Sequence, residues 1–190
     1  MSMDSTQLCR HLRTYLPPAS AFGAARSWAV PLWDHALALY AQPEVMTACL
    51  YLQDDAGVDV CELLWVCWLQ VHGLTLDDDV DSALDDVRAW QTEMTLPLRR
   101  QRRALKKRAL TNPGLAELRE TIQRAELLAE RETLVRLQTL AERGQGIRPL
   151  GAEDPPLEKR LASRLGLQKK PHLSALKTLE TRLDPPTQPR

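Results

Sequence analysis

The stretch from Asp59 to Gly73, D-V-C-E-L-L-W-V-C-W-L-Q-V-H-G, decides the fold of this chain. Wound as a helix, it is apolar on nearly every side, and such a helix is buried in a core. Asp59 is a good N-cap with Glu62 three residues later, and Gly73 suits the left-handed residue that ends a helix. The run is shorter than the roughly 20 residues that a bilayer requires. It therefore predicts a buried core helix that includes Trp68.

Helical periodicity extends outward from this stretch in both directions. The predicted helices cover residues 5–16, 27–42, 43–53, 59–72, 75–111 with a bend or restart at Pro97, and 115–143. Asn112-Pro113-Gly114 is a turn signal between the last two. Two long helices joined by so short a turn form an antiparallel hairpin. We predict an all-α fold, a compact multi-helix cluster with a long antiparallel helical hairpin.

The composition changes after Gly144. The last 47 residues hold seven prolines and no aromatic residue, which predicts a largely disordered C-terminal tail. Leucine stripes that begin at Leu157 and Leu173 are each too short to hold a helix alone, so they either dock on the domain or fold on a partner. We predict an N-terminal short helix and linker over 1–26, a helical domain over 27–143 and a flexible tail over 144–190. A chain ending at Arg143 is expected to stay folded.

Charge and cysteine usage narrow the class of protein. The formal net charge is zero, so no global field favours nucleic acid or membrane partners. The four cysteines form no C-x-x-C pair, and the N-terminus has no basic start followed by an apolar run. The scattered histidines have no nucleophile obviously paired with them. We expect a cytoplasmic protein with reduced thiols, no metal, no cofactor and no catalytic residues.

Three segments resemble a known family. They are the run from Leu32 to Leu69 with its L-Q-D-x-x-G-x-D-V turn, the segment P-L-R-R-Q-R-R-A-L-K from Pro97, and the acidic segment E-L-L-A-E-R-E from Glu126. Together they are similar to an uncharacterised proteobacterial family of small helical proteins, over about residues 27–142. The resemblance marks Gln53, Asp54, Gly57, Asp59 and Trp68 as a structural motif. The chain departs from the family at Cys61, where a small polar residue is expected. No activity is assigned to this family, so the resemblance implies a fold only.

The strongest functional signal is a basic run. Residues 94–111 carry seven bases and no acid, whereas residues 74–93 carry seven acids and one base. On a helix, Arg99, Arg102, Arg103 and Lys106 share a face, with Arg100 and Lys107 beside it. Such a face suits RNA phosphates, anionic lipid or an acidic protein, and it equally suits pairing with the glutamates of the long helix. No aromatic residue lies in the run to stack on a base, so sequence-specific reading of single strands is not expected.

The aspartates offer an alternative. Asp77, Asp78 and Asp81 belong to a D-D-x-x-D string like that by which isoprenoid synthases hold magnesium-bound diphosphate, and Asp55 and Asp59 form another pair four residues apart. Acids also gather at helix N-termini for purely electrostatic reasons. If these carboxylates converge in space, the hypothesis of a magnesium-dependent enzyme is favoured.

We therefore expect a non-enzymatic cytoplasmic interaction or adaptor protein that binds an anionic partner through a basic helical hairpin. The alternatives are a magnesium-dependent, diphosphate-handling enzyme and an RNA- or ribosome-associated factor. The sequence leaves open the process, the identity of the partner and the oligomeric state.

Overall fold

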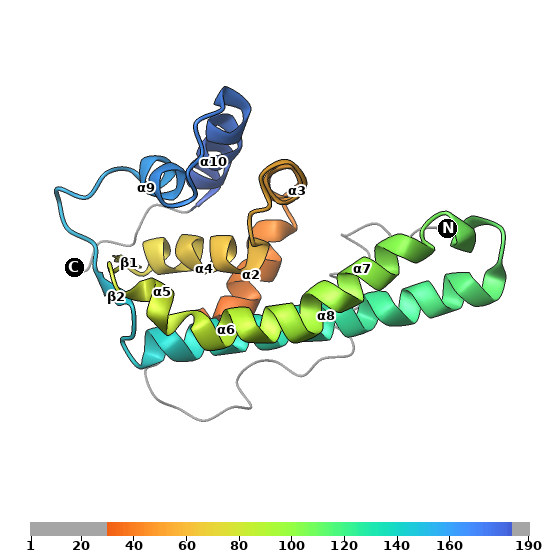
Figure 1. The fold of residues 1–190 in the computed structure, drawn as a ribbon. Coiled ribbons are helices and arrows are strands. Elements are labelled where there is room, and N and C mark those ends of the chain that lie inside the picture. Colours follow the sequence, from red (N-terminus) through yellow and green to blue (C-terminus); the bar gives the residue numbers. More distant parts are fainter. Residues whose placement is uncertain (1–29, 184–190) are drawn as a thin grey trace. The chain divides into compact units, whose positions relative to one another are not determined.

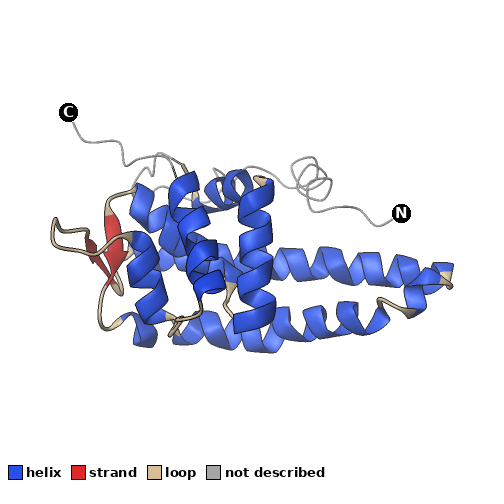
Figure 2. Ribbon diagram, turned by 90° about the horizontal axis from the view of Figure 1, so that it is seen from above, coloured by secondary structure: helices blue, strands red, loops and turns tan. Residues whose placement is uncertain are grey.

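The structure, a computed structural model, describes residues 30–183, so the expected helix at 5–16 lies outside the described residues. The chain divides into two compact units. Unit 1 comprises residues 1–77 and 147–190, and unit 2 comprises residues 78–146. Helices dominate the described part of both units, and the only strands described are two short ones (Figures 1 and 2). The predicted all-α fold class is confirmed.

Unit 1 is built on helix α4 (Val60–Val71), the stretch that decides the fold. Every residue from Leu63 to Leu69 is buried, and Trp68 is fully so. The Trp68 indole Nε1 donates a hydrogen bond of 2.8 Å to the carbonyl oxygen of Val30. Helices α2 (Leu32–Tyr40) and α3 (Pro43–Ala56) pack against α4. The predicted core helix is confirmed, with its ring of apolar side chains covered on all sides.

The turn between α3 and α4 explains the L-Q-D-x-x-G-x-D-V pattern. Gly57 is left-handed with φ 68°, and its N–H donates to the carbonyl of Gln53, while the N–H of Val58 donates to Leu52. The bond from Gly57 to Gln53 is that of an αL motif, and together the two bonds satisfy carbonyls at the end of α3. Asp59 then accepts a 2.8 Å bond from the N–H of Glu62 and caps α4.

A short antiparallel sheet takes the place of a predicted helix start. Strand β1 (Leu74–Leu76) pairs with β2 (Ile147–Pro149), with Thr75 opposite Arg148. The helix expected from Thr75 begins instead with α5 (Val80–Ala83). The prediction was wrong here because the hydrogen-bond partners of β1 lie about seventy residues away in the sequence, where no local pattern reveals them.

The flexible tail predicted for residues 144–190 is wrong for the described residues 144–183. These form β2, α9 (Leu157–Arg164) and α10 (Lys170–Arg182), and α10 packs on both α3 and α9. Leu157, Leu161, Leu176 and Leu179 are buried. Each leucine stripe is too short to stand alone in water. The stripes fold because each is covered by another helix of unit 1.

Unit 2 is the predicted antiparallel hairpin. Helix α6 (Asp85–Trp90), a π-helical turn η2 (Gln91–Thr95) and α7 (Leu96–Leu105) follow one another along α8 (Pro113–Glu142). Figure 1 shows α7 and α8 side by side, and Figure 2 shows the same two long helices from above. A 3₁₀ turn, η3 (Arg108–Leu110), leads into the bend. Asn112 caps α8 by accepting a bond from the N–H of Leu115.

A glycine closes unit 2 at the other end of α8. Gly146 is left-handed with φ 65°, and a Cβ added there would lie 2.8 Å from the Cα atom of Val80. Only a residue without a side chain allows this approach between the end of the hairpin and α5.

Candidate functional site

The basic run on α7 is divided between two environments. Arg99 and Arg102 turn toward α8, where Glu126 lies almost fully buried. The Nε of Arg99 is 3.0 Å from Glu126, and its Nη2 is 2.5 Å from Glu130. Arg102 binds Glu126 through both its Nε and its Nη2. We call these four residues the ionic ladder of the hairpin.

The ladder keeps its charges at neutral pH. Burial alone raises the pKa of Glu126, but hydrogen bonds and positive charge from Arg102 and Arg99 outweigh burial and hold its pKa below the usual value. Burial likewise lowers the pKa of Arg99, and the charge of Glu130 with the bonds to both glutamates raises it above its usual value. Two of the six residues predicted to bind a partner, Arg99 and Arg102, are therefore bound inside the hairpin. The sequence grouped them with Arg103 and Lys106 because helical spacing shows a shared face but not what covers it.

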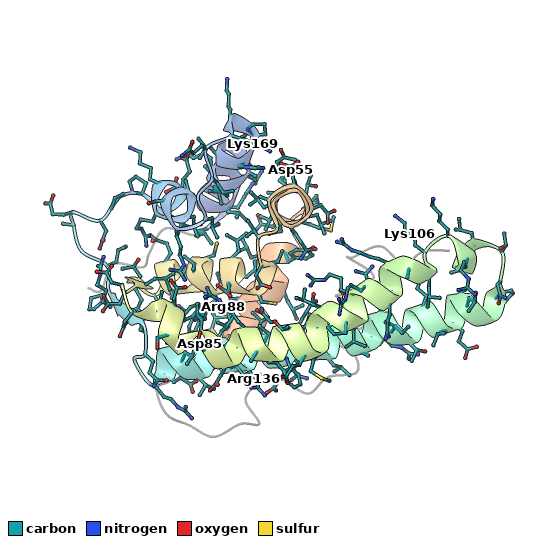
Figure 3. The ribbon with its side chains drawn as sticks, viewed as in Figure 1. Asp55, Asp85, Arg88, Lys106, Arg136 and Lys169 are labelled. Atoms are coloured by element: carbon teal, nitrogen blue, oxygen red, sulfur yellow. The ribbon has the colours of Figure 1, made fainter. Side chains whose placement is uncertain are left out.

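The remaining cations of the run form an exposed surface. We call it the outer basic face, and it consists of Arg100, Arg103, Lys106, Lys107 and Arg108, all exposed. Arg100 and Arg103 are three residues apart on α7, the spacing of one helix face, whereas Lys106 and Lys107 lie in the turn after α7 and Arg108 begins η3. Figure 3 labels Lys106 near the far end of α7. Within residues 30–183, Arg100, Lys106, Lys107 and Arg108 make no ion pair. Sequence reasoning missed Arg108 as part of this face, although it belongs to the same basic run.

Two cations elsewhere in unit 2, Arg88 and Arg136, lie against acids. Arg88 is 3.0 Å from Asp81, and Arg136 is 2.9 Å from Glu132. The guanidinium of Arg136 also lies 4.6 Å from the centre of the Trp90 ring, whose Nε1 donates to the carbonyl of Ala129. The two contacts of Trp90 join α6 to α8. The cations Arg88, Arg99, Arg102 and Arg136 thus have acidic partners within the hairpin, whereas Arg100, Lys106, Lys107 and Arg108 have no ion pair within residues 30–183.

The aspartates named for a magnesium site do not converge. Asp59 caps α4, Asp81 binds Arg88, and Asp55 binds His172 and Lys169 of unit 1. In residues 30–183, no group of three or more His, Cys, Asp or Glu side chains is placed to hold a metal ion.

Asp55 instead fastens α10 to α3. Its Oδ2 lies 2.7 Å from Nε2 of the buried His172 and 3.4 Å from Nζ of Lys169, as Figure 3 shows for Asp55 and Lys169. The bonds from His172 and Lys169 lower the pKa of Asp55. At the other end of α10, Arg182 binds Glu44 at 2.9 Å. The sequence held no local sign of these contacts, because the partners are more than one hundred residues apart.

The buried thiols of Cys49 and Cys67 are not reactive groups. Cys49, Cys61 and Cys67 are all buried and form no disulfide. Burial raises the pKa of Cys49 to about 12, and burial with the nearby Cys49 raises the pKa of Cys67 further. Thiols of this kind stay protonated and serve as small apolar side chains.

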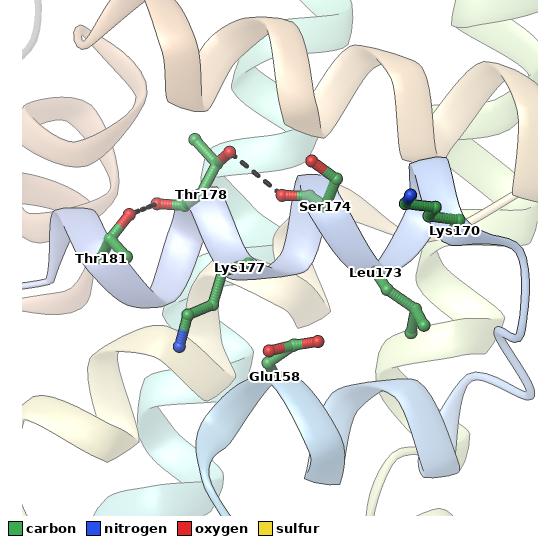
Figure 4. A pocket seen from close by; sticks show the side chains of 7 residues that line it. All are labelled: Glu158, Lys170, Leu173, Ser174, Lys177, Thr178 and Thr181. Atoms are coloured by element: carbon green, nitrogen blue, oxygen red, sulfur yellow. Dashed lines mark hydrogen bonds between the residues drawn. The ribbon is translucent and has the colours of Figure 1, made fainter.

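A shallow groove runs along α10 beside Glu158 of α9 (Figure 4). Its volume is about 360 Å³, and it is lined by Lys170, Leu173, Ser174 and Lys177 among others. Lys177 binds Glu180 at 2.6 Å, and the Thr178 and Thr181 hydroxyls donate to backbone carbonyls of the same helix. The polar groups of this groove are largely occupied by their own helix, so it offers a ligand little.

None of the helices in residues 30–183 combines the length and the apolar character needed to cross a membrane. The chain matches no curated protein and no solved structure. Residues 31–137, more than half of the chain, match the family described as "Protein of unknown function (DUF2390)". That span runs from the start of α2 into the second half of α8 and contains the α3–α4 turn, the basic run and the ionic ladder. The predicted resemblance to an uncharacterised family of helical proteins is thus confirmed, and the chain belongs to the DUF2390 family.

Proposed function

We propose that this protein is a non-enzymatic interaction protein of the cytoplasm, which binds an anionic partner through the outer basic face, formed by α7 and the turn that follows it. One observation carries the proposal. The outer basic face places five exposed cations within nine residues, in a segment that contains no acid. The two arginines beside them are neutralised by Glu126 and Glu130.

The ionic ladder supports this function by fixing α7 on α8. Arg99 and Arg102 hold the inner side of α7 through bonds to one nearly buried carboxylate. The outer side chains therefore project from a helix that is already ordered. A preordered surface loses less entropy when it binds, which raises affinity for a given number of contacts.

The exposed charges are unfavourable to one another without a partner. Two like charges 4 Å apart in water repel by about 1 kcal/mol, and salt at physiological strength screens charges beyond about 8 Å. The cost in stability is therefore small, whereas the positive potential attracts anions from solution. This arrangement suits a binding surface better than a stabilising one.

The test compares two charge-reversal variants of the full chain in affinity capture from the native cell. The first variant carries Arg100→Glu, Arg103→Glu and Lys107→Glu. The control variant carries Lys159→Glu, Arg164→Glu and Lys170→Glu, the same change of charge at exposed positions on α9 and α10. We expect both variants to keep the circular dichroism spectrum of the wild type.

Only the first variant should lose the partners that the wild type captures. If it captures the same partners in the same amounts as the control, the outer basic face is a solvated surface and the proposed function is wrong.

A further inference from the structure

We propose that the anionic partner is the phosphate backbone of a nucleic acid, bound without reading of base sequence. This inference rests on the proposed function and names the partner class of the same surface. It follows from what the outer basic face contains and from what it lacks.

The face lacks the apolar centre of a protein interface. Interfaces between proteins concentrate their binding energy in buried aromatic and aliphatic anchors and are poor in lysine. Between Arg100 and Arg108 the only apolar residues are Ala104 and Leu105, and Leu105 is half-buried. The exposed leucines nearest to the face, Leu96 and Leu110, stand beyond its two ends. An acidic protein partner would find charge here and no anchor.

The face also differs from a membrane-surface helix. Such a helix lies in the interface with its apolar side in the lipid and its basic side toward the headgroups. In α7, Leu98 and Leu105 are half-buried where the helix packs along α8, and Leu96 at its start is exposed. Most of the apolar side is thus in contact with α8, and the exposed side of the helix is mainly charged.

The spacing of the cations suits successive phosphates. A helix rises about 1.5 Å per residue, so Arg100 and Arg103 are about 4.5 Å apart along the axis of α7, and Lys107 follows in the turn after this helix. Phosphates along one strand of a duplex follow at about 3.4 Å along its axis, so the two arginines are spaced for neighbouring phosphates. The guanidinium fork of arginine binds phosphate in bidentate fashion.

Base reading has no support on this surface. Residues 91–122 contain no aromatic residue and no histidine, so no aromatic ring there can stack on an unpaired base. Contacts to phosphate alone position a protein without selecting a sequence. The partner is therefore defined by its charged backbone.

The experiment measures binding of the full-length protein to four probes by fluorescence anisotropy as salt is raised. The probes are a mixed-sequence duplex DNA, a mixed-sequence duplex RNA, a single-stranded RNA and poly-glutamate. Vesicles containing phosphatidylserine are tested by co-sedimentation. If all five cations contact duplex DNA, log K should fall with log salt at a slope of about −4.5, or about −3.5 for a single strand. A fourfold rise in salt then weakens duplex binding by roughly 500-fold.

Glutamine substitutions, which remove positive charges without reversing them, test whether the outer basic face itself binds the nucleic acid. Arg100→Gln, Arg103→Gln and Lys107→Gln together should reduce the magnitude of the duplex slope by about 2.7. The control, with Lys159→Gln, Arg164→Gln and Lys170→Gln, should keep the wild-type slope. Probes of different sequence but equal length and strandedness should bind alike. The four probes show whether the backbone is duplex or single-stranded and whether it is DNA or RNA.

Each other outcome overturns the inference in a distinct way. Tighter binding to poly-glutamate than to any nucleic acid assigns the face to an acidic protein, and binding to vesicles alone assigns it to a lipid surface. If no nucleic acid binds while charge reversal still abolishes capture from cells, the inference fails and the proposed function stands. If the charge-reversal variant also captures every partner, both fail.

Discussion

Replacement of Glu126 by glutamine tests the ionic ladder directly. Glu126 is a buried acid in the middle of the hairpin, and its carboxylate receives bonds from Arg99 and Arg102. Glutamine keeps the size of the side chain but removes the charge and turns an amide N–H₂ toward guanidinium donors. The change therefore leaves the guanidinium groups of Arg99 and Arg102 facing a neutral amide, which cannot balance their charge or accept all of their hydrogen bonds.

The magnitude follows from the burial of the three partners. Breaking a fully buried ion pair costs about 3–5 kcal/mol, and a hydrogen bond to a charged group contributes about 1.5–3 kcal/mol. The side chains of Arg99 and Arg102 are 13% and 23% exposed, and Arg99 keeps its bond to Glu130. Because of this exposure and the remaining bond, we expect Glu126→Gln to lower the free energy of unfolding by about 2–4 kcal/mol. For a chain of this length the melting temperature should fall by roughly 4–16 °C.

The measurement is thermal unfolding followed by far-ultraviolet circular dichroism, with Glu132→Gln as the control. The pair between Glu132 and Arg136 is about 40% exposed on both sides, so its loss should cost only about 0.5 kcal/mol. If the two variants melt within about 2 °C of each other, the ladder does not stabilise the hairpin and the reasoning is refuted.

The same variant predicts a pH dependence. The pKa of Glu126 lies below its usual value of 4.5 in the folded protein. The stabilisation by its charge is thus fully present above the unfolded pKa and is lost as pH falls through the folded pKa. The difference in stability between the wild type and Glu126→Gln should therefore narrow below about pH 4.5 and should be constant between about pH 6 and 8. A difference that grew on acidification would contradict the assignment.

Two further predictions concern unit 1. Trp68→Ala should lower the free energy of unfolding by about 3–5 kcal/mol, because it opens a cavity around a fully buried position and removes the bond to Val30; a denaturant midpoint equal to that of the wild type would show that α4 is not the core. A chain ending at Arg143 should melt well below the full chain, contrary to the prediction from composition, because removal of α10 uncovers the face of α3 that it packs on. Burial of each leucine side chain of α9 and α10 contributes about 1.5–3 kcal/mol to the free energy of unfolding, and the shortened chain loses this contribution. An unchanged melting curve for the shortened chain would mean that α9 and α10 add nothing to unit 1.

The contrast between α4 and α10 shows what composition can predict. Helix α4 was predictable because its signal is local and strong: a cap at Asp59, a dense apolar run and a glycine stop. Helix α10 has a weaker stripe within a proline-rich segment, and its stability comes from contact with α3. A segment whose order depends on a distant partner resembles a flexible tail in any local measure of sequence.

The candidate site shows the same difference between local signals, which the sequence reveals, and distant contacts, which it does not. Helical spacing predicted that the arginines and lysines of α7 lie close together, and Asn112 with Pro113 predicted the hairpin that carries them. Spacing could not show which of them face α8. That depended on Glu126, which comes within hydrogen-bond distance of Arg99 and Arg102 only once the two helices are packed. The aspartates show a different limit of sequence motifs. They match a metal-binding string, but the fold gives them separate partners.

By itself, the sequence determined the helices of the core and of the hairpin, the caps at Asp59 and Asn112, the burial of α4 and the existence of a basic hairpin. All of these depend on residues within a few turns of one another, whose free energies are set by local hydrogen bonds and by apolar periodicity. Only the tertiary structure decided that β1 pairs with β2, that residues 150–183 fold onto unit 1, and that Glu126 neutralises Arg99 and Arg102. Each of these depends on contacts between segments far apart in the chain. Their energy exists only after packing brings the partners within a few ångströms and excludes water from between them.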